Sequence, residues 1–171
     1  MTKIILSIFF IILCQINCFA GVEEGAKFVK NFNKWRVFVK EEKNKQHCTV
    51  IANPISTSGF SGFRDLPYIG FVSTKGSNFS FSIYAGFVIN KDRAIQVFVN
   101  DDLFYLKFYR DFFAYTYDVN DDIKLINTVL LSKSILRVRI ESKEKEVAND
   151  YYDLQGLDRA FAFLKEHYKC S

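Results

Sequence analysis

The sequence predicts a mainly β, single-domain fold, either an antiparallel β-sandwich or a barrel-like sheet, with two short covering helices. Three observations predict it. Apolar and polar residues alternate along 79–87, short apolar runs separated by polar turns follow, and two late segments carry apolar residues at helical spacing. Short strands at this spacing are typical of antiparallel sandwiches and barrels.

The first strands precede an irregular loop. Apolar residues at period two predict a strand over 35–39. A charged turn leads to a second strand over 48–52, which Pro54 ends, so the two strands are expected to form a hairpin. Serines and glycines over 55–65 then predict a mobile loop.

The middle of the chain alternates most regularly. One side of 79–87 is apolar and the other is small or polar, so one face is expected to lie in the core. Polar turns separate three further strands, expected at 94–99, 103–109 and 112–117. In the second of these, the residues expected to face the core are Phe104, Leu106 and Phe108.

Two helices are predicted in the last third. The first begins at 120–122, whose acidic and amide side chains suit a helix N-terminus, and its expected buried residues are Ile123, Ile126, Val129 and Leu130. Extended segments at 135–140 and 151–153 come next. The final helix is expected at 157–167, with a buried stripe of Leu157, Ala160, Phe161 and Leu164.

The N-terminus has the pattern of a cleaved signal peptide. Lys3 precedes the apolar run 4–13, and a mildly polar segment ends at Ala20. That run is shorter than the roughly 20 apolar residues of a membrane-spanning helix. We therefore expect a signal peptide over 1–20, one domain over 21–171 without stable transmembrane insertion, and a periplasmic or outer-surface location. Lipidation at Cys18 or Cys14 is the alternative.

After loss of the signal peptide, Cys48 and Cys170 remain. Two cysteines in an oxidising compartment predict one disulfide, although the sequence does not place their Cα atoms within bridging distance. Zinc bound with His47 and His167 is the alternative. Adjacent residues of a strand point to opposite faces, which makes joint ligation by His47 and Cys48 awkward. We expect no metal and no cofactor.

Catalysis and nucleic-acid binding are not favoured by the sequence. A thiol enzyme needs an activated, reduced cysteine, whereas export favours a disulfide. Serine-hydrolase and phosphate-binding motifs are absent from the sequence. The formal net charge of +4 is spread along the chain, and the aromatic and basic segment 103–110 is expected to belong to the sheet. We expect a non-enzymatic protein with no nucleic-acid partner.

The 55–65 loop supplies the candidate binding surface. Phe60 and Phe63 flank small residues there, and Arg64 adds a charge. Exposed aromatic side chains on a loop are effective anchors for a partner. The alternative is that both phenylalanines fold back onto the sheet.

Three stretches of the mature chain carry packing and turn patterns of a known family. They are Trp35-Arg36-Val37 with Cys48-Thr49-Val50, the run from Gly86 to Asp101, and Leu154-Gln155-Gly156-Leu157 with Ala160 and Leu164. On these residues the chain resembles the invasion-associated locus B family, small exported proteins of alphaproteobacteria. The resemblance implies a β-rich envelope domain and, for some members, a link to host-cell entry.

These observations lead us to expect an envelope protein that binds another protein or an envelope component. The alternative is a periplasmic carrier of small apolar ligands, in which the polar face of 79–87 lines a β-barrel cavity.

Overall fold

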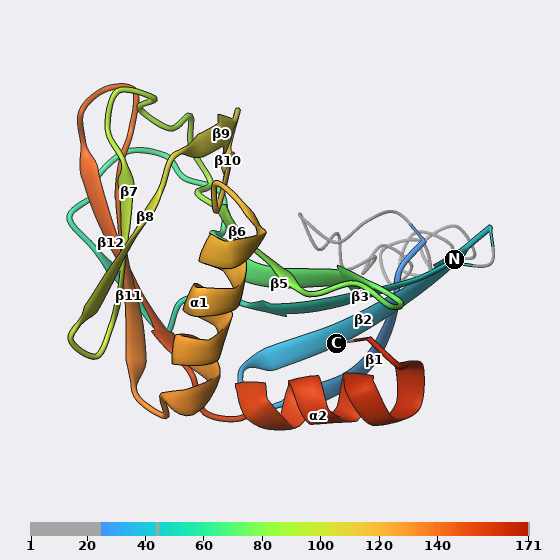
Figure 1. The fold of residues 1–171 in the computed structure, drawn as a ribbon. Coiled ribbons are helices and arrows are strands. Elements are labelled where there is room, and N and C mark those ends of the chain that lie inside the picture. The colour runs from blue at the N-terminus through green and yellow to red at the C-terminus, as the bar shows by residue number, and fades with distance from the viewer. Residues whose placement is uncertain (1–24, 44, 171) are drawn as a thin grey trace, which may run out of the picture.

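Two antiparallel sheets and two helices make up residues 25–43 and 45–170, which are the residues that the computed structural model describes (Figure 1). The signal peptide and the lipidation sites predicted within 1–20 lie outside them. The strands are β1 (Lys27–Phe32), β2 (Trp35–Glu42), β3 (Lys45–Ala52), β4 (Ser56–Ser58), β5 (Tyr68–Thr74), β6 (Ser80–Tyr84), β7 (Ile95–Val99), β8 (Asp102–Leu106), β9 (Phe108–Arg110), β10 (Phe113–Tyr115), β11 (Ile135–Glu141) and β12 (Val147–Asp153). The helices are α1 (Val119–Leu131) and α2 (Leu157–Tyr168).

The strands form an open, two-sheet arrangement. A seven-stranded sheet has the order β1-β2-β3-β5-β6-β10-β9, and a five-stranded sheet has the order β4-β12-β11-β7-β8. The mainly β prediction is confirmed. The sheets do not close into a barrel and are consistent with a β-sandwich, so residues 25–43 and 45–170 do not form the barrel cavity of the carrier hypothesis.

One continuous core joins the inner faces of the two sheets to both helices. Trp35 and Phe71 pack at its centre with their ring centroids 5.7 Å apart, and both are fully buried. The core face predicted along 79–87 is confirmed, because its apolar members are all buried; they are Phe79, Phe81, Ile83, Ala85 and Phe87. The opposite face is not uniformly exposed, since Ser82 and Gly86 are buried as well.

The chain changes sheets immediately after Leu106. β8 pairs with β7 in the five-stranded sheet, whereas β9 pairs with β10 in the seven-stranded sheet. Leu106 is buried but Phe108 is 56% exposed, so the prediction that Phe108 faces the core is wrong. The crossing at Lys107 breaks the single strand expected over 103–109 and ends its alternation.

The central strand β5 has no counterpart among the predicted strands. It lies between β3 and β6, and five of its seven residues, including Ile69 and Phe71, are buried. A strand buried on both faces has no alternation of apolar and polar residues from which it could be predicted. Gly70 fits this crowded position, since an added Cβ would lie 3.3 Å from side-chain atoms of both Ile51 and Ser82.

A buried carboxylate sets the orientation of α1. Asp122 accepts hydrogen bonds from the backbone N–H of Phe81 at 2.7 Å and from the hydroxyl of Thr116 at 2.6 Å. With Asp122 facing inward, the helix buries Leu125, Ile126 and Val129. Ile123 is therefore 39% exposed, and the prediction that it is buried is wrong.

The second helix is fixed at both ends. At its start, Gly156 has φ +92°, and an added Cβ would lie 2.8 Å from the carbonyl oxygen of Phe32. Beyond its end, Cys170 forms a disulfide with Cys48 of β3, with an S–S distance of 2.07 Å and a Cα–Cα distance of 6.4 Å. The predicted pairing is thus present. Neither helix among the described residues is long and apolar enough to cross a membrane.

Loss of the bridge should destabilise the domain. The bridged cysteines are 122 positions apart, and closing so long a loop removes entropy from the unfolded chain equivalent to roughly 4 to 5 kcal/mol. Cys170→Ser should lower the free energy of unfolding by about 4 kcal/mol, measured by urea unfolding with the fluorescence of Trp35, the single tryptophan. Reduced wild-type protein should match the variant. Equal stability of the variant and the oxidised wild type would contradict this account.

Candidate partner-binding loop

The candidate loop connects the two sheets. It leaves β4, which pairs with β12, and ends where β5 begins. Gly59 turns the chain with φ +83°, and an added Cβ would lie only 2.7 Å from the carbonyl oxygen of Val147. Glycine is therefore required where the loop leaves the five-stranded sheet.

Arg64 anchors the middle of the loop to a buried carboxylate. Its Nη1 and Nη2 donate to the two carboxylate oxygens of Asp150 at 2.7 and 2.6 Å. Its Nε donates to the carbonyl oxygen of Ala85 at 2.6 Å. The Arg64 side chain is 9% exposed and that of Asp150 is 0% exposed, so this is a two-pronged, buried ion pair.

Aromatic packing supports the same anchor. The Phe60 ring stacks on Phe87 with centroids 4.8 Å apart, and the guanidinium carbon of Arg64 lies 4.7 Å from the Phe87 centroid. A guanidinium at this distance from an aromatic ring is attracted to its face. Phe60 therefore folds back onto the protein, which is what the alternative interpretation of the loop expected of it. Arg64 is held both by its ion pair with Asp150 and by the Phe87 ring.

Further hydrogen bonds of backbone and side-chain groups hold the loop in place. The N–H of Asp65 donates to the carbonyl oxygen of Gly86 at 3.0 Å, and the hydroxyl of Tyr84 donates to the Asp65 carboxylate at 3.0 Å. Asn53 donates to the carbonyl oxygen of Pro67 at 2.7 Å, just before β5. The serine- and glycine-rich composition predicted a mobile loop, but the structure shows one held by many specific contacts.

The anchored loop presents apolar side chains to solvent. Phe63 is 90% exposed and Leu66 is 65% exposed, on either side of the inward-pointing Arg64. We call Phe63 and Leu66 the loop tip. The structure thus separates the three residues singled out in the sequence: Phe63 is outside, Phe60 is packed, and Arg64 is bonded within the protein rather than offering its charge to a partner.

Sequence reasoning missed two parts of this site. Leu66 was not predicted as a binding residue, because it is a single apolar residue beside Pro67 and belongs to no periodic pattern. Asp150 lies between Ala148 and Tyr152 on the inner face of β12, and all three are fully buried. The period of two along 148–152 was the available signal for a buried acid, but it does not indicate which distant cation neutralises it.

The phenol of Tyr152 lies in the same buried region. Burial raises the pKa of Tyr152 well above the ordinary tyrosine value; the negative charge of Asp150 raises it further, and Arg64 lowers it. The hydroxyl has no hydrogen-bond partner among the residues that the structure describes. Its ionised form is therefore strongly disfavoured in the folded protein.

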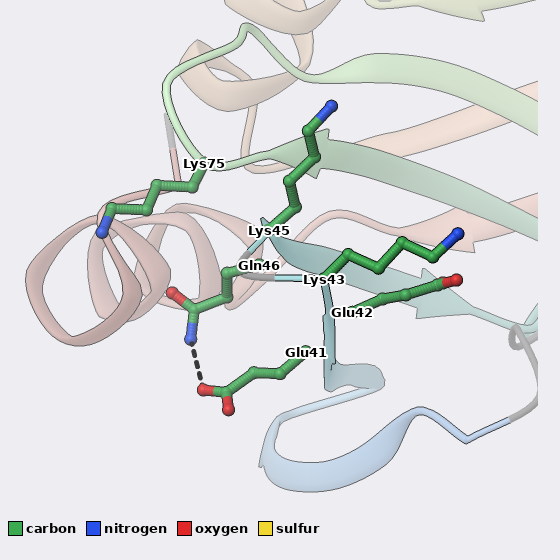
Figure 2. Close-up of a pocket in the computed structure, with 6 residues that line it drawn as sticks. All are labelled: Glu41, Glu42, Lys43, Lys45, Gln46 and Lys75. Carbon is green, nitrogen blue, oxygen red and sulfur yellow. Dashed lines mark hydrogen bonds between the residues drawn. The ribbon is translucent and has the colours of Figure 1, made fainter.

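A separate recess of about 450 Å³ lies at the turn between β2 and β3. Figure 2 shows Lys45 and Lys75 extending in different directions and the one hydrogen bond drawn there, from Gln46 to Glu41 at 3.4 Å. The lysines and glutamates of this recess are all exposed, so water solvates their charges. The full lining is Glu41, Glu42, Lys43, Lys45, Gln46 and Lys75.

The residues considered for zinc lie in other arrangements. Cys48 and Cys170 share a disulfide and so are not thiolate ligands here. His47 Nδ1 lies 3.3 Å from the hydroxyl oxygen of Thr74, and the His167 ring packs 4.6 Å from the Phe163 ring. Within residues 25–43 and 45–170, no three histidine, cysteine or acidic side chains are grouped so that they could hold a metal ion.

Comparisons with protein-family models and with curated proteins find no match to this chain. Among solved structures, the crystal structure of invasion associated protein B from Bartonella henselae matches it with a TM-score of 0.58. The two proteins share a fold. The match covers 82% of this chain and 97% of that one at 13% sequence identity. The resemblance expected from the sequence is thus confirmed for the fold, and family membership stays a prediction.

Removing one partner of the buried ion pair should strongly destabilise the protein. Asp150→Asn should lower the free energy of unfolding by about 3 kcal/mol or more, because the Arg64 charge would stay buried without compensation. The double variant Arg64→Met/Asp150→Asn should lose less than the sum of the single losses, measured by urea unfolding. Glu42→Ala, which removes the partly exposed pair with Lys40, is the control and should cost less than about 1 kcal/mol. A loss for Asp150→Asn no larger than that of the control would contradict the proposed role.

Tyr152 should make the protein sensitive to alkali. Its folded pKa lies above the unfolded value of about 10, so its contribution to stability is complete below pH ~10 and is lost as the pH rises toward the folded pKa. Tyr152→Phe should reduce this alkaline loss and change stability little at neutral pH, because the hydroxyl has no hydrogen-bond partner within residues 25–43 and 45–170. Urea unfolding at several pH values measures both effects. The exposed Tyr117→Phe is the control, and identical alkaline profiles for the two variants would refute the assignment.

Proposed function

We propose that this chain is a non-enzymatic envelope protein that binds another protein through the loop tip, Phe63 and Leu66. One observation carries the proposal: a 90% exposed phenylalanine stands on a loop that a buried ion pair holds in place. Large apolar side chains at the centre of an interface supply much of its binding energy. Phe63 has the exposure that such an anchor needs.

The rigidity of the loop strengthens the proposal. A binding segment that is already ordered loses little conformational freedom when a partner docks, so more of the contact energy appears as affinity. The bonds from Arg64 to Asp150 and the stacking of Phe60 on Phe87 provide that order. Burying Phe63 in a partner would contribute roughly 1.5 to 3 kcal/mol.

The envelope location rests on two supports. Disulfides persist in oxidising compartments, and the bridge from Cys48 to Cys170 joins parts of the fold distant in the sequence. The fold is that of invasion associated protein B, whose name links that protein to invasion. We include contact with a host cell in the proposal on this likeness and assign no partner by name.

Replacement of the anchor should weaken binding. The domain carrying a photo-crosslinking residue at Leu66 should capture a discrete protein from envelope extract, and adding Phe63→Ser should reduce the yield at least tenfold, which corresponds to about 1.4 kcal/mol. Leu131→Ser is the matched control, since Leu131 is 86% exposed at the end of α1, away from the loop. Far-ultraviolet circular dichroism and urea unfolding should show all variants folded. Equal capture by the Phe63→Ser and Leu131→Ser proteins would exclude the loop tip as the binding surface.

A further inference from the structure

The two sheets end in four edge strands, and three of them carry features that discourage pairing with another chain. β1 has lysines at Lys27 and Lys30 and a register shift between Phe28 and Lys30. β4 and β9 are only three residues long. Lysines, irregular register and short length are the usual protection of exposed edges.

The fourth edge, β8, lacks this protection. It is five residues long, and its one charged residue is Asp102 at the first position. Its outward side chains are apolar or aromatic, with Leu103 40% and Tyr105 49% exposed. Among the described residues, β7 is its one neighbour in the five-stranded sheet, so β8 lies at the end of the strand order (Figure 1).

The register of the hairpin leaves backbone groups of β8 unpaired. Val99 is opposite Asp102 across a two-residue turn, so these two exchange hydrogen bonds, and alternate pairs along the hairpin do the same. The N–H and C=O groups of Leu103 and Tyr105 then point away from β7, toward the open edge. Four backbone groups on this edge are therefore available to form hydrogen bonds with an added strand.

We propose that β8 pairs antiparallel with β8 of a second copy of this chain, with the twofold axis at Phe104. Leu103 then lies opposite Tyr105 of the second copy, in a pair that exchanges backbone hydrogen bonds. Just beyond each end of the pairing, the exposed Asp101 in the turn before β8 comes near the exposed Lys107 at the crossing after β8 of the other copy. The spacing of Asp101, Leu103, Tyr105 and Lys107 is therefore self-complementary in charge and in apolar character.

Other pairings are less favourable. A parallel pairing in register would place Asp101 against Asp101 and Lys107 against Lys107, and like charges directly opposite are destabilising.

An open recess of about 460 Å³ borders β8 and the start of α1, with Tyr117 and Lys124 on its far wall. The side chains of a second strand paired with β8 could occupy this recess.

The dimer should be weak. Two five-residue strands bury less surface than the roughly 1,200 Å² of a stable interface. We expect a dissociation constant in the micromolar to submillimolar range, with monomer predominating in dilute solution. The pairing uses none of the loop-tip residues and is independent of the proposed function.

Charge exchange tests the pairing and its register. Sedimentation equilibrium should show a reversible dimer of wild-type protein, and Asp101→Lys or Lys107→Asp alone should weaken it about tenfold, since each puts like charges opposite at both ends. The double variant Asp101→Lys/Lys107→Asp should restore the dimer, because the charges then match again. A strictly monomeric wild type, or a double variant as weak as the single ones, would overturn the proposal.

Two further variants serve as controls. Asp92→Lys makes the same change in net charge at an exposed turn outside β8 and should leave the dimer intact. Leu103→Pro removes an N–H that faces the open edge, so the strand should keep its pairing with β7 and lose the dimer. Persistence of the dimer in Leu103→Pro would also overturn the proposal. Phe63→Ser should dimerise normally, which separates this result from the test of the loop tip.

Discussion

The fold places a carboxylate, that of Asp150, where water does not reach it, and much of the surrounding structure follows from that constraint. Asp150 lies on the inner face of β12, and a buried carboxylate without a cation would be unfavourable by several kcal/mol. The cation comes from Arg64 on the loop to the other sheet. Neutralising Asp150 therefore fixes the path between the sheets, and Phe63 and Leu66 face solvent because Arg64 faces inward.

Asp122 has a comparable role at the other side of the core. Its carboxylate accepts hydrogen bonds from Phe81 of β6 and Thr116, so it selects one rotation of α1 among several that would bury apolar residues. In both places a buried acid specifies an arrangement that apolar packing alone leaves open. The disulfide gives α2 a similar covalent constraint at Cys170.

The sequence predicted the features that depend on local pattern and missed those that depend on distant partners. The apolar face of 79–87, the final helix and the Cys48–Cys170 pair follow from period-two spacing, helical spacing and cysteine count, and each is present in the structure. β5 was not predicted, because a strand buried on both faces does not alternate between apolar and polar residues. The inward turn of Arg64 depends on Asp150, which is 86 positions away, so no local pattern could reveal it.

The Cys48–Cys170 bridge also determines how the molecule would respond to mechanical tension. Force applied to the two ends of the chain would pass from Cys48 to Cys170 through the sulfur atoms and bypass the residues between them. Of the described strands, β1, β2 and the first residues of β3 precede Cys48, so these are the ones that tension would draw out. The loop tip and β8 lie within the bridged segment, so neither would carry the tension directly.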